Sequence, residues 1–309
     1  MRLLVLGAGG TGGYFGGRLA QAGADVTFLV RPPRARRLRE DGLRIVSPLG
    51  DARLSVATLV QADLASPAVE GFDLVLLACK AYDLDTAMDA VAPAVVAGAR
   101  VVPLLNGLRH YDALDGRFGF DSVLGGLCFI SATLGTEGEI LHLGKPASIT
   151  FGERAGQSTD ARLQSLAQAC VHAGIDHLHS DDIAQAQWIK YSFLATLAAG
   201  TCLMRASIGT IVASDGGEAF MAALHDECLA VAAAEGQPIP GKARDAARAG
   251  LTAAGSDVKA SMLRDLEGGH RVEAMHIVGD MLCRAERHGL PAPNLRAAWV
   301  HLQCYEAMR

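Results

Sequence analysis

The sequence predicts an α/β domain with a parallel sheet, followed by an all-α domain. Its 309 residues are enough for about two domains. Up to residue 180, short apolar runs alternate with helical patterns, which is typical of a parallel sheet covered by helices. Beyond that point the strand signals stop and Ala-rich helical patterns follow. We therefore expect domains at residues 1–180 and 181–309.

The expected elements of the first domain follow this alternation. Apolar runs predict strands, and amphipathic stretches predict helices, at 3–6 (strand), 10–22 (helix), 25–30 (strand), 73–79 (strand), 82–96 (helix) and 101–105 (strand). The segments 43–48 and 53–58 flank a Leu-Gly-Asp turn and predict an antiparallel pair. Short strands are expected at 123–131, 138–143 and 148–151, then a helix at 160–173 and a last strand at 175–178.

The second domain is predicted to contain helices at 182–199, 215–235, 256–267, 270–288 and 294–308. An uncharged, mostly apolar stretch at residues 191–204 is shorter than the roughly 18 residues that a membrane span needs. We therefore expect a buried helix there and no interaction with a membrane.

Composition excludes several classes of protein. The net charge is −5, with 28 Lys and Arg against 33 Asp and Glu, so no nucleic-acid partner is expected. The 7 cysteines are scattered without a C-x-x-C pair, which indicates reduced thiols and a cytoplasmic protein. The apolar run at the N-terminus is too short for an export signal and is predicted to be a strand.

A glycine-rich loop joins the first strand to the first helix in the sequence VLGAGGTGG. Gly7, Gly9 and Gly12 form a G-x-G-x-x-G pattern, which alone is weak, but its position between strand and helix is the one that binds dinucleotides. The alternative is a turn without a ligand. The pattern favours a Rossmann-type dinucleotide-binding domain, and the loop residues expected to bind the cofactor are Gly7, Ala8, Gly9, Gly10, Thr11 and Gly12.

Three polar residues follow predicted strands, where open α/β sheets bind ligands. Arg31 stands where NAD enzymes usually carry an acidic residue, so together with Arg34 it favours the 2′-phosphate of NADP(H) over the free hydroxyl of NAD(H). The alternative is an ordinary solvated basic helix. Lys80 and Asn106 each end an apolar run and are predicted cofactor-binding residues, although a snorkelling lysine and an Asn-Gly turn explain them equally well individually.

Candidate catalytic residues lie in the helical half. Lys190 begins the uncharged stretch, where burial favours a group that releases its proton. The alternative is an ordinary helix-end lysine whose ammonium group reaches solvent. Ser261 and Glu273 would be about 18 Å apart on one helix, but Gly268-Gly269 offers a turn that brings them closer. We expect no metal site, because the spacing of the histidines at 172, 177 and 179 does not favour one.

Taken together, these segments resemble the ketopantoate reductase (2-dehydropantoate 2-reductase) family. The likeness covers nearly the whole chain, through GAGGTGG with Arg31, LLACKAYD, PLLNG, QWIK, SMLRD, HRVEAMHIVGD and HGLPAPN. It implies a Rossmann domain, a helical domain and a substrate cleft between them. It also implies hydride transfer from NADPH to a 2-oxo acid, with Lys190 as catalytic lysine, Glu273 as catalytic and substrate-orienting acid, and Ser261 and Asn106 as substrate-binding residues.

One departure from the family leaves the substrate open. Leu194 and Ala198 stand where the family commonly has asparagines, on the lysine's side of the helix. The leading expectation is reduction of ketopantoate to pantoate in pantothenate biosynthesis. A paralogue that reduces a more apolar 2-oxo acid and a non-catalytic NADP-binding sensor are the alternatives. The partner is thus a small molecule, and a homodimer is compatible with the sequence, which does not determine oligomeric state, stereochemistry or pathway.

Overall fold

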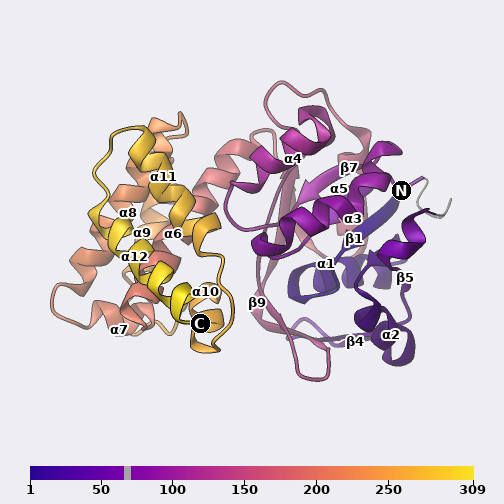
Figure 1. Ribbon diagram of the computed structural model, residues 1–309, viewed down its shortest axis with the longest axis horizontal. Coiled ribbons are helices and arrows are strands. Elements are labelled where there is room, and N and C mark those ends of the chain that lie inside the picture. Colours follow the sequence, from indigo (N-terminus) through magenta and orange to yellow (C-terminus); the bar gives the residue numbers. More distant parts are fainter. Residues whose placement is uncertain (66–70) are drawn as a thin grey trace. The chain divides into compact units, whose positions relative to one another are not determined.

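The computed structural model describes residues 1–65 and 71–309 and divides into two compact units (Figure 1). Unit 1 comprises Met1–Leu105 and His110–Ile183, and unit 2 comprises Asn106–Arg109 and Ala184–Arg309. Unit 1 contains two sheets with flanking helices, whereas unit 2 is helical, so the predicted fold class is confirmed. A short stretch from the first half, residues 106–109, groups with the second unit.

The first sheet of unit 1 is entirely parallel, with strand order β5-β2-β1-β6-β7. Its central strand β1 is fully buried over Leu3, Leu4 and Val5, as expected for a strand covered on both faces. The apolar runs that predicted these strands are therefore core sequences. The bounds are β1 Arg2–Leu6, β2 Asp25–Leu29, β5 Ala57–Leu59, β6 Leu74–Leu77 and β7 Arg100–Pro103.

The second sheet has the order β10-β9-β3-β4, and β8 pairs with β9. Its strands are β3 Leu43–Val46, β4 Ala52–Leu54, β8 Gly125–Leu134, β9 Ile140–Gly152 and β10 Asp176–His179. The predicted strands 138–143 and 148–151 are wrong as separate elements, because β9 is one continuous strand from Ile140 to Gly152. Strand β8 is antiparallel to it, with a register shift between Ile130 and Ala132. The predicted strand 53–58 is split: β4 is antiparallel to β3, but β5 is parallel to β2 in the first sheet.

The helices of unit 1 are α1 Gly10–Gln21, α2 Pro32–Asp41, α3 Leu84–Val96, α4 His110–Phe118 and α5 Ala161–His172. Short 3₁₀ turns occur at η1 Gln61–Ala65, η3 Ala81–Asp83 and η4 Phe120–Ser122. The sequence pattern did not predict α4, and it left α2 as one alternative for the basic segment. Helix α2 buries only Ala35 and Leu38, so its apolar periodicity is weak.

Unit 2 consists of helices packed around one apolar core. Its elements are α6 Ile183–Met204, α7 Ile208–Val212, α8 Gly217–Ala234, α9 Gly241–Leu251, α10 Ser261–Glu267, the π-helical turn η5 Met275–Gly279, α11 Asp280–Arg287 and α12 Pro293–Met308. The uncharged stretch lies in α6, where Ala195, Ala198 and Cys202 are fully buried. Within the described ranges, no helix is both long and apolar enough to traverse a bilayer.

Two predicted helices of unit 2 begin later than expected. Residues before α10 instead bond to α7, where the Ile208 and Gly209 N–H groups donate to the Val258 and Ser256 carbonyls at 3.0 and 2.8 Å. Residues 270–273 are also non-helical, and the Val272 N–H donates to Glu306 Oε1 at 2.8 Å. Long-range partners thus compete successfully with local helix formation in both segments.

Candidate functional site

The glycine loop in unit 1 has the close backbone packing that its sequence predicts. Gly7 has a φ of +89°, a left-handed conformation that glycine adopts without strain, and its N–H donates to the Leu29 carbonyl at 3.0 Å. A Cβ at Gly12 would lie 2.4 Å from the Gly7 carbonyl oxygen. Only a glycine at position 12 therefore lets α1 start directly against the loop.

The space beside the loop differs between Gly9 and Gly10. A Cβ at Gly10 would lie 2.4 Å from the Ala132 carbonyl oxygen, so sheet packing explains this glycine. A Cβ at Gly9 would meet only a Leu134 methyl at 3.8 Å. The first turn of α1 also has neither a capping side chain nor an acidic residue, which leaves its N–H groups suited to an anion. These features fit the pyrophosphate of a dinucleotide.

Two arginines near the loop have different environments. Arg31 precedes α2, is exposed and bonds through Nη2 to Asp83 Oδ1 at 3.0 Å. Arg34 donates to the Ala8 carbonyl at 2.8 and 3.2 Å and to the Gly138 carbonyl at 2.7 Å. Burial and the nearby Arg37 lower the pKa of Arg34. Arg34 therefore braces the glycine loop, a role that the sequence pattern did not indicate.

Lys80 and Asn106 both follow strands of the parallel sheet. Lys80 lies beyond β6, half-buried, at the start of η3. Strand β7 is the parallel neighbour of β6, with Leu77 opposite Pro103, and Asn106 lies three residues beyond its end. Asn106, unlike Lys80, belongs to unit 2.

Within unit 2, Lys190 and Asn106 meet directly. Lys190 lies on α6 with only 8% of its surface exposed, and its Nζ donates to Asn106 Oδ1 at 2.9 Å. The next residue, Gly107, has a φ of +76°. A Cβ there would lie 2.5 Å from the His276 carbonyl oxygen, so the Asn106-Gly107 loop lies against η5.

The same turn connects the lysine helix with Glu273. The Tyr191 hydroxyl, one residue after Lys190, donates to the Ile277 carbonyl at 2.8 Å. The Glu273 carbonyl accepts the His276 and Ile277 N–H groups, each at 3.1 Å, so Glu273 is bonded to the first turn of η5, from which Ala274 separates it in sequence. Glu273 is 7% exposed. Lys190, the Asn106 loop and the Glu273 segment are thus held together by contacts within one unit.

Ser261 lies at the exposed start of α10. That helix ends at Glu267, and the chain turns at Gly268-Gly269, where Gly269 has a φ of +70°. Ser261 and Glu273 are therefore on separate segments, joined by the turn that the glycine pair indicated.

A buried ionic network behind the lysine helix was not predicted. Asp280 Oδ2 lies 3.0 Å from the Tyr191 hydroxyl and accepts from Arg284 Nε at 2.9 Å. Arg284 also bonds to Glu235 at 2.5 Å. Burial and the Asp280 charge raise the pKa of Tyr191 well above its usual value, so the hydroxyl stays protonated. The signal in the sequence was an acid and an arginine four residues apart on an otherwise apolar helix face.

His276 is a second titratable group that the pattern missed. It is 7% exposed, and burial, reinforced by Arg109 and opposed by Asp280, lowers its pKa to about 4. Its imidazole is therefore neutral at neutral pH and makes no charge contribution to the segment that follows Glu273.

Two family models match the chain. The model described as "Ketopantoate reductase PanE/ApbA" matches residues 3–156, and the model described as "Ketopantoate reductase PanE/ApbA C terminal" matches residues 182–306. Together they cover both units.

Individual relatives extend over the full length. An uncharacterized oxidoreductase, YkpB, from Bacillus subtilis is 38% identical over 308 residues, covering 99% of each chain. A 2-dehydropantoate 2-reductase from Halobacterium salinarum is 32% identical and covers 96% of each. Among solved structures, a ketopantoate reductase from Ralstonia eutropha has a TM-score of 0.87 at 28% identity, covering 100% of this chain and 99% of its own.

Proposed function

The chain belongs to the ketopantoate reductase family of oxidoreductases, and from this membership we propose that it reduces a 2-oxo acid to a 2-hydroxy acid with NADPH. We propose 2-dehydropantoate as the substrate and pantoate as the product, in pantothenate biosynthesis. The observation that carries the proposal is the buried Lys190, bonded to Asn106 and tied to the Glu273 segment.

The nicotinamide cofactor supplies the hydride that reaches the ketone carbon. As the carbon–oxygen double bond becomes single, negative charge develops on the ketone oxygen. A protonated Lys190 stabilises that charge and transfers one proton to the oxygen, after which solvent reprotonates the amine. The bond to Asn106 limits the directions in which the Lys190 ammonium points. Glu273 and Ser261 orient the substrate.

A direct test is NADPH oxidation, followed spectrophotometrically, with a panel of 2-oxo acids. We expect Lys190→Met and Glu273→Gln to lower kcat by about 10²-fold or more and to leave dinucleotide binding unchanged. Lys259→Met and Glu267→Gln are matched controls, because this pair is exposed and joined by an ion pair of 2.7 Å. If the protein binds NADPH but reduces no oxo acid, the reductase proposal is wrong and a sensor role is favoured.

The preference for NADPH is a separate proposal that rests on Arg31. Its exposed guanidinium follows β2, where an acidic residue would select NADH. We expect Arg31→Ala to weaken NADPH binding about tenfold or more, with little change for NADH. The control is Arg39→Ala, which removes an exposed arginine near the far end of α2. An unchanged ratio of the two affinities would overturn the assignment.

A more apolar 2-oxo acid is the second candidate substrate. Leu194 and Ala198 lie one and two helical turns beyond Lys190 on α6, and Leu194 is only partly buried. Ala198 is fully buried in the core, so Leu194 is the one of the two that a substrate can contact. Its apolar side chain favours an alkyl or aromatic group over the hydroxyl of ketopantoate. If kcat/KM is higher for such a substrate, and Leu194→Asn reverses the order, this candidate replaces ketopantoate.

A further inference from the structure

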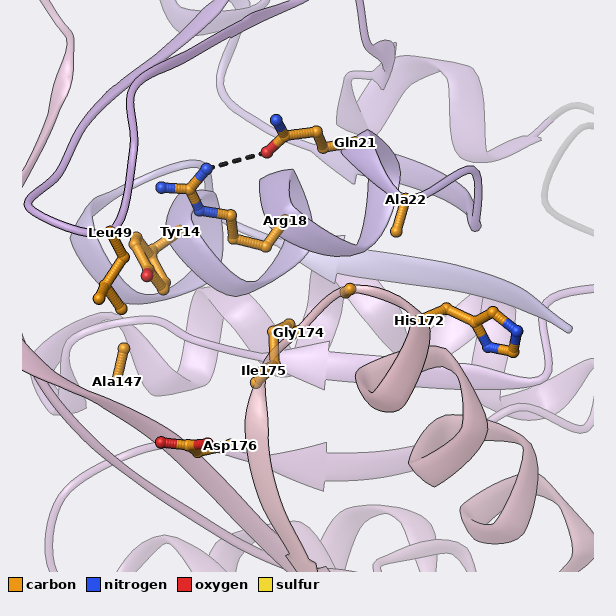
Figure 2. A pocket seen from close by; sticks show the side chains of 11 residues that line it. Tyr14, Arg18, Gln21, Ala22, Leu49, Ala147, His172, Gly174, Ile175 and Asp176 are labelled. Carbon is orange, nitrogen blue, oxygen red and sulfur yellow. Dashed lines mark hydrogen bonds between the residues drawn. The ribbon is translucent and has the colours of Figure 1, made fainter.

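A pocket of about 360 Å³ lies in unit 1, at the end of α1 opposite the glycine loop. Its walls come from the last turns of α1, the turn after α5 and the start of β10 (Figure 2). Helix α1 has 12 residues, so about 18 Å of helix axis separates the two ends. The pocket is therefore distinct from the loop proposed to hold the dinucleotide.

One wall of the pocket carries a buried arginine. Arg18 is 9% exposed, and its guanidinium bonds to Gln21 Oε1 at 2.9 Å and to the Gly50 carbonyl, and stacks on the Tyr14 ring at 5.2 Å. Within residues 1–65 and 71–309 it forms no ion pair. Buried charges are normally compensated by an opposite charge, so a bound anion would supply what the protein does not.

Tyr14 adds a hydrogen-bonding group to the same wall. The residue is 3% exposed, and its ring packs against His142 at 4.7 Å. Its hydroxyl nevertheless has no hydrogen-bond partner in the part of the chain that the structure describes. Because Tyr14 lines the pocket and its hydroxyl is not bonded to any described residue, the hydroxyl is available to donate a hydrogen bond to a polar ligand atom.

The opposite wall carries a negative charge. Figure 2 shows Asp176 on β10, across the pocket from Tyr14 and Arg18, whereas the His172 ring lies apart from all three. Asp176 is exposed and forms no ion pair with the described residues. Helix α5 also ends on this side of the pocket, and the C-terminal end of a helix favours a cation. The pocket thus presents separated positive and negative walls.

We propose that this pocket binds a small zwitterion, with a carboxylate on Arg18 and the Tyr14 hydroxyl and an ammonium group on Asp176. A molecule that carries both charges matches both walls, whereas a simple anion leaves Asp176 unpaired and faces its repulsion. The pocket volume is at the small end of the range for metabolite sites.

Isothermal titration of the full-length protein with linear ω-amino acids, from glycine to 6-aminohexanoate, tests the proposal. We expect saturable binding at one or two chain lengths, at least about tenfold tighter than for the alkyl carboxylate or the alkylamine of equal length. Binding should persist in saturating NADPH. No binding at 10 mM of any amino acid, equal binding of the carboxylate alone, or displacement by NADPH would each overturn it.

Variants locate the site. Tyr14→Phe keeps the ring contacts and removes the hydroxyl, and Asp176→Asn removes the charge on the other wall; each should weaken binding about tenfold. Asp181→Asn, an exposed residue outside the pocket, should leave it unchanged. Both test variants alter groups without a protein partner, so folding is preserved. Unchanged binding in both variants would show that the amino acid binds elsewhere.

Discussion

Gly107 offers a measurement of how tightly the Asn106 loop is fixed against the π-helical turn. Replacing it with alanine imposes two costs. The φ of +76° is strained for any residue with a Cβ, at about 1–2 kcal/mol. The new Cβ would also lie 2.5 Å from the His276 carbonyl oxygen, which is backbone and must move, at about 1–3 kcal/mol. The two costs together lower the free energy of unfolding of unit 2 by about 2–5 kcal/mol.

Gly289 provides a matched control for the first cost. It lies in the same unit with a φ of +64°, but a Cβ there would meet nothing within 4 Å. Gly289→Ala should therefore lose only the strain of about 1–2 kcal/mol. The difference between the two variants isolates the contact with His276.

Urea unfolding followed by tryptophan fluorescence suits the comparison, because both tryptophans of the chain, Trp188 and Trp299, belong to unit 2. We also expect Gly107→Ala to lower kcat, since a displaced loop moves the Asn106 amide away from Lys190. An equal loss of stability in the two variants would refute the close packing of the loop. An unchanged kcat despite the larger loss would refute its role in holding the lysine.

Three further predictions concern stability. Tyr191→Phe removes the bond to the Ile277 carbonyl and should destabilise unit 2 by about 1–2 kcal/mol, measured by tryptophan fluorescence. Burial, with Arg248 and Arg244 adding and Asp226 opposing, lowers the pKa of His225 from 6.5 to about 4, so the unfolded chain binds the extra proton first. Stability of unit 2 should therefore fall as pH drops from 6.5 to 4, and His225→Leu should reduce that slope by about half, His276 supplying the rest. Burial acts to raise the pKa of Asp160, but the Arg162 N–H and the Arg100 guanidinium outweigh it and hold the pKa below 3.8, so its stabilisation is present above that pH and lost below it. Asp160→Asn should cost unit 1 about 1–3 kcal/mol at pH 7 and flatten its acid unfolding, measured by hydrogen exchange.

A control separates the effect of Tyr191→Phe from general perturbation. Tyr305 is partly buried, but its hydroxyl donates to the His270 carbonyl at 2.7 Å in an exposed hydrogen bond, so Tyr305→Phe should cost less than Tyr191→Phe. Equal effects of the two variants would contradict the importance assigned to burial.

Much of the fold of unit 1 could be predicted from local sequence patterns. Apolar runs identify buried parallel strands because such strands are covered on both faces, and the glycine spacing reports backbone contacts a few residues apart. The antiparallel β3–β4 pair was also predicted from local sequence, because the Leu-Gly-Asp turn lies between its strands.

Longer-range contacts were beyond the pattern. The sequence places Asn106 at the end of a strand, but not in contact with a lysine 84 residues later. The meeting of Asp280 with Tyr191 depends on how α11 packs against α6, and the Arg18 pocket depends on two helix ends and a strand that are far apart in sequence. Periodicity contains no information about which helices become neighbours, so these contacts were not predicted, although Asn106 and Lys190 themselves were.

The π-helical turn at Met275–Gly279 has a consequence for how this protein can vary. A π turn holds one residue more than an α-helical turn between the same anchors, and each residue of an α-helix rotates the chain by about 100°. Deleting one residue from the turn would allow ordinary helix throughout, with Asp280 still anchored in the core. Glu273 would then face a different direction, although no side chain near it had changed. The number of residues in the turn therefore determines the direction of the Glu273 side chain. Insertions and deletions in this turn should change that direction more than substitutions do.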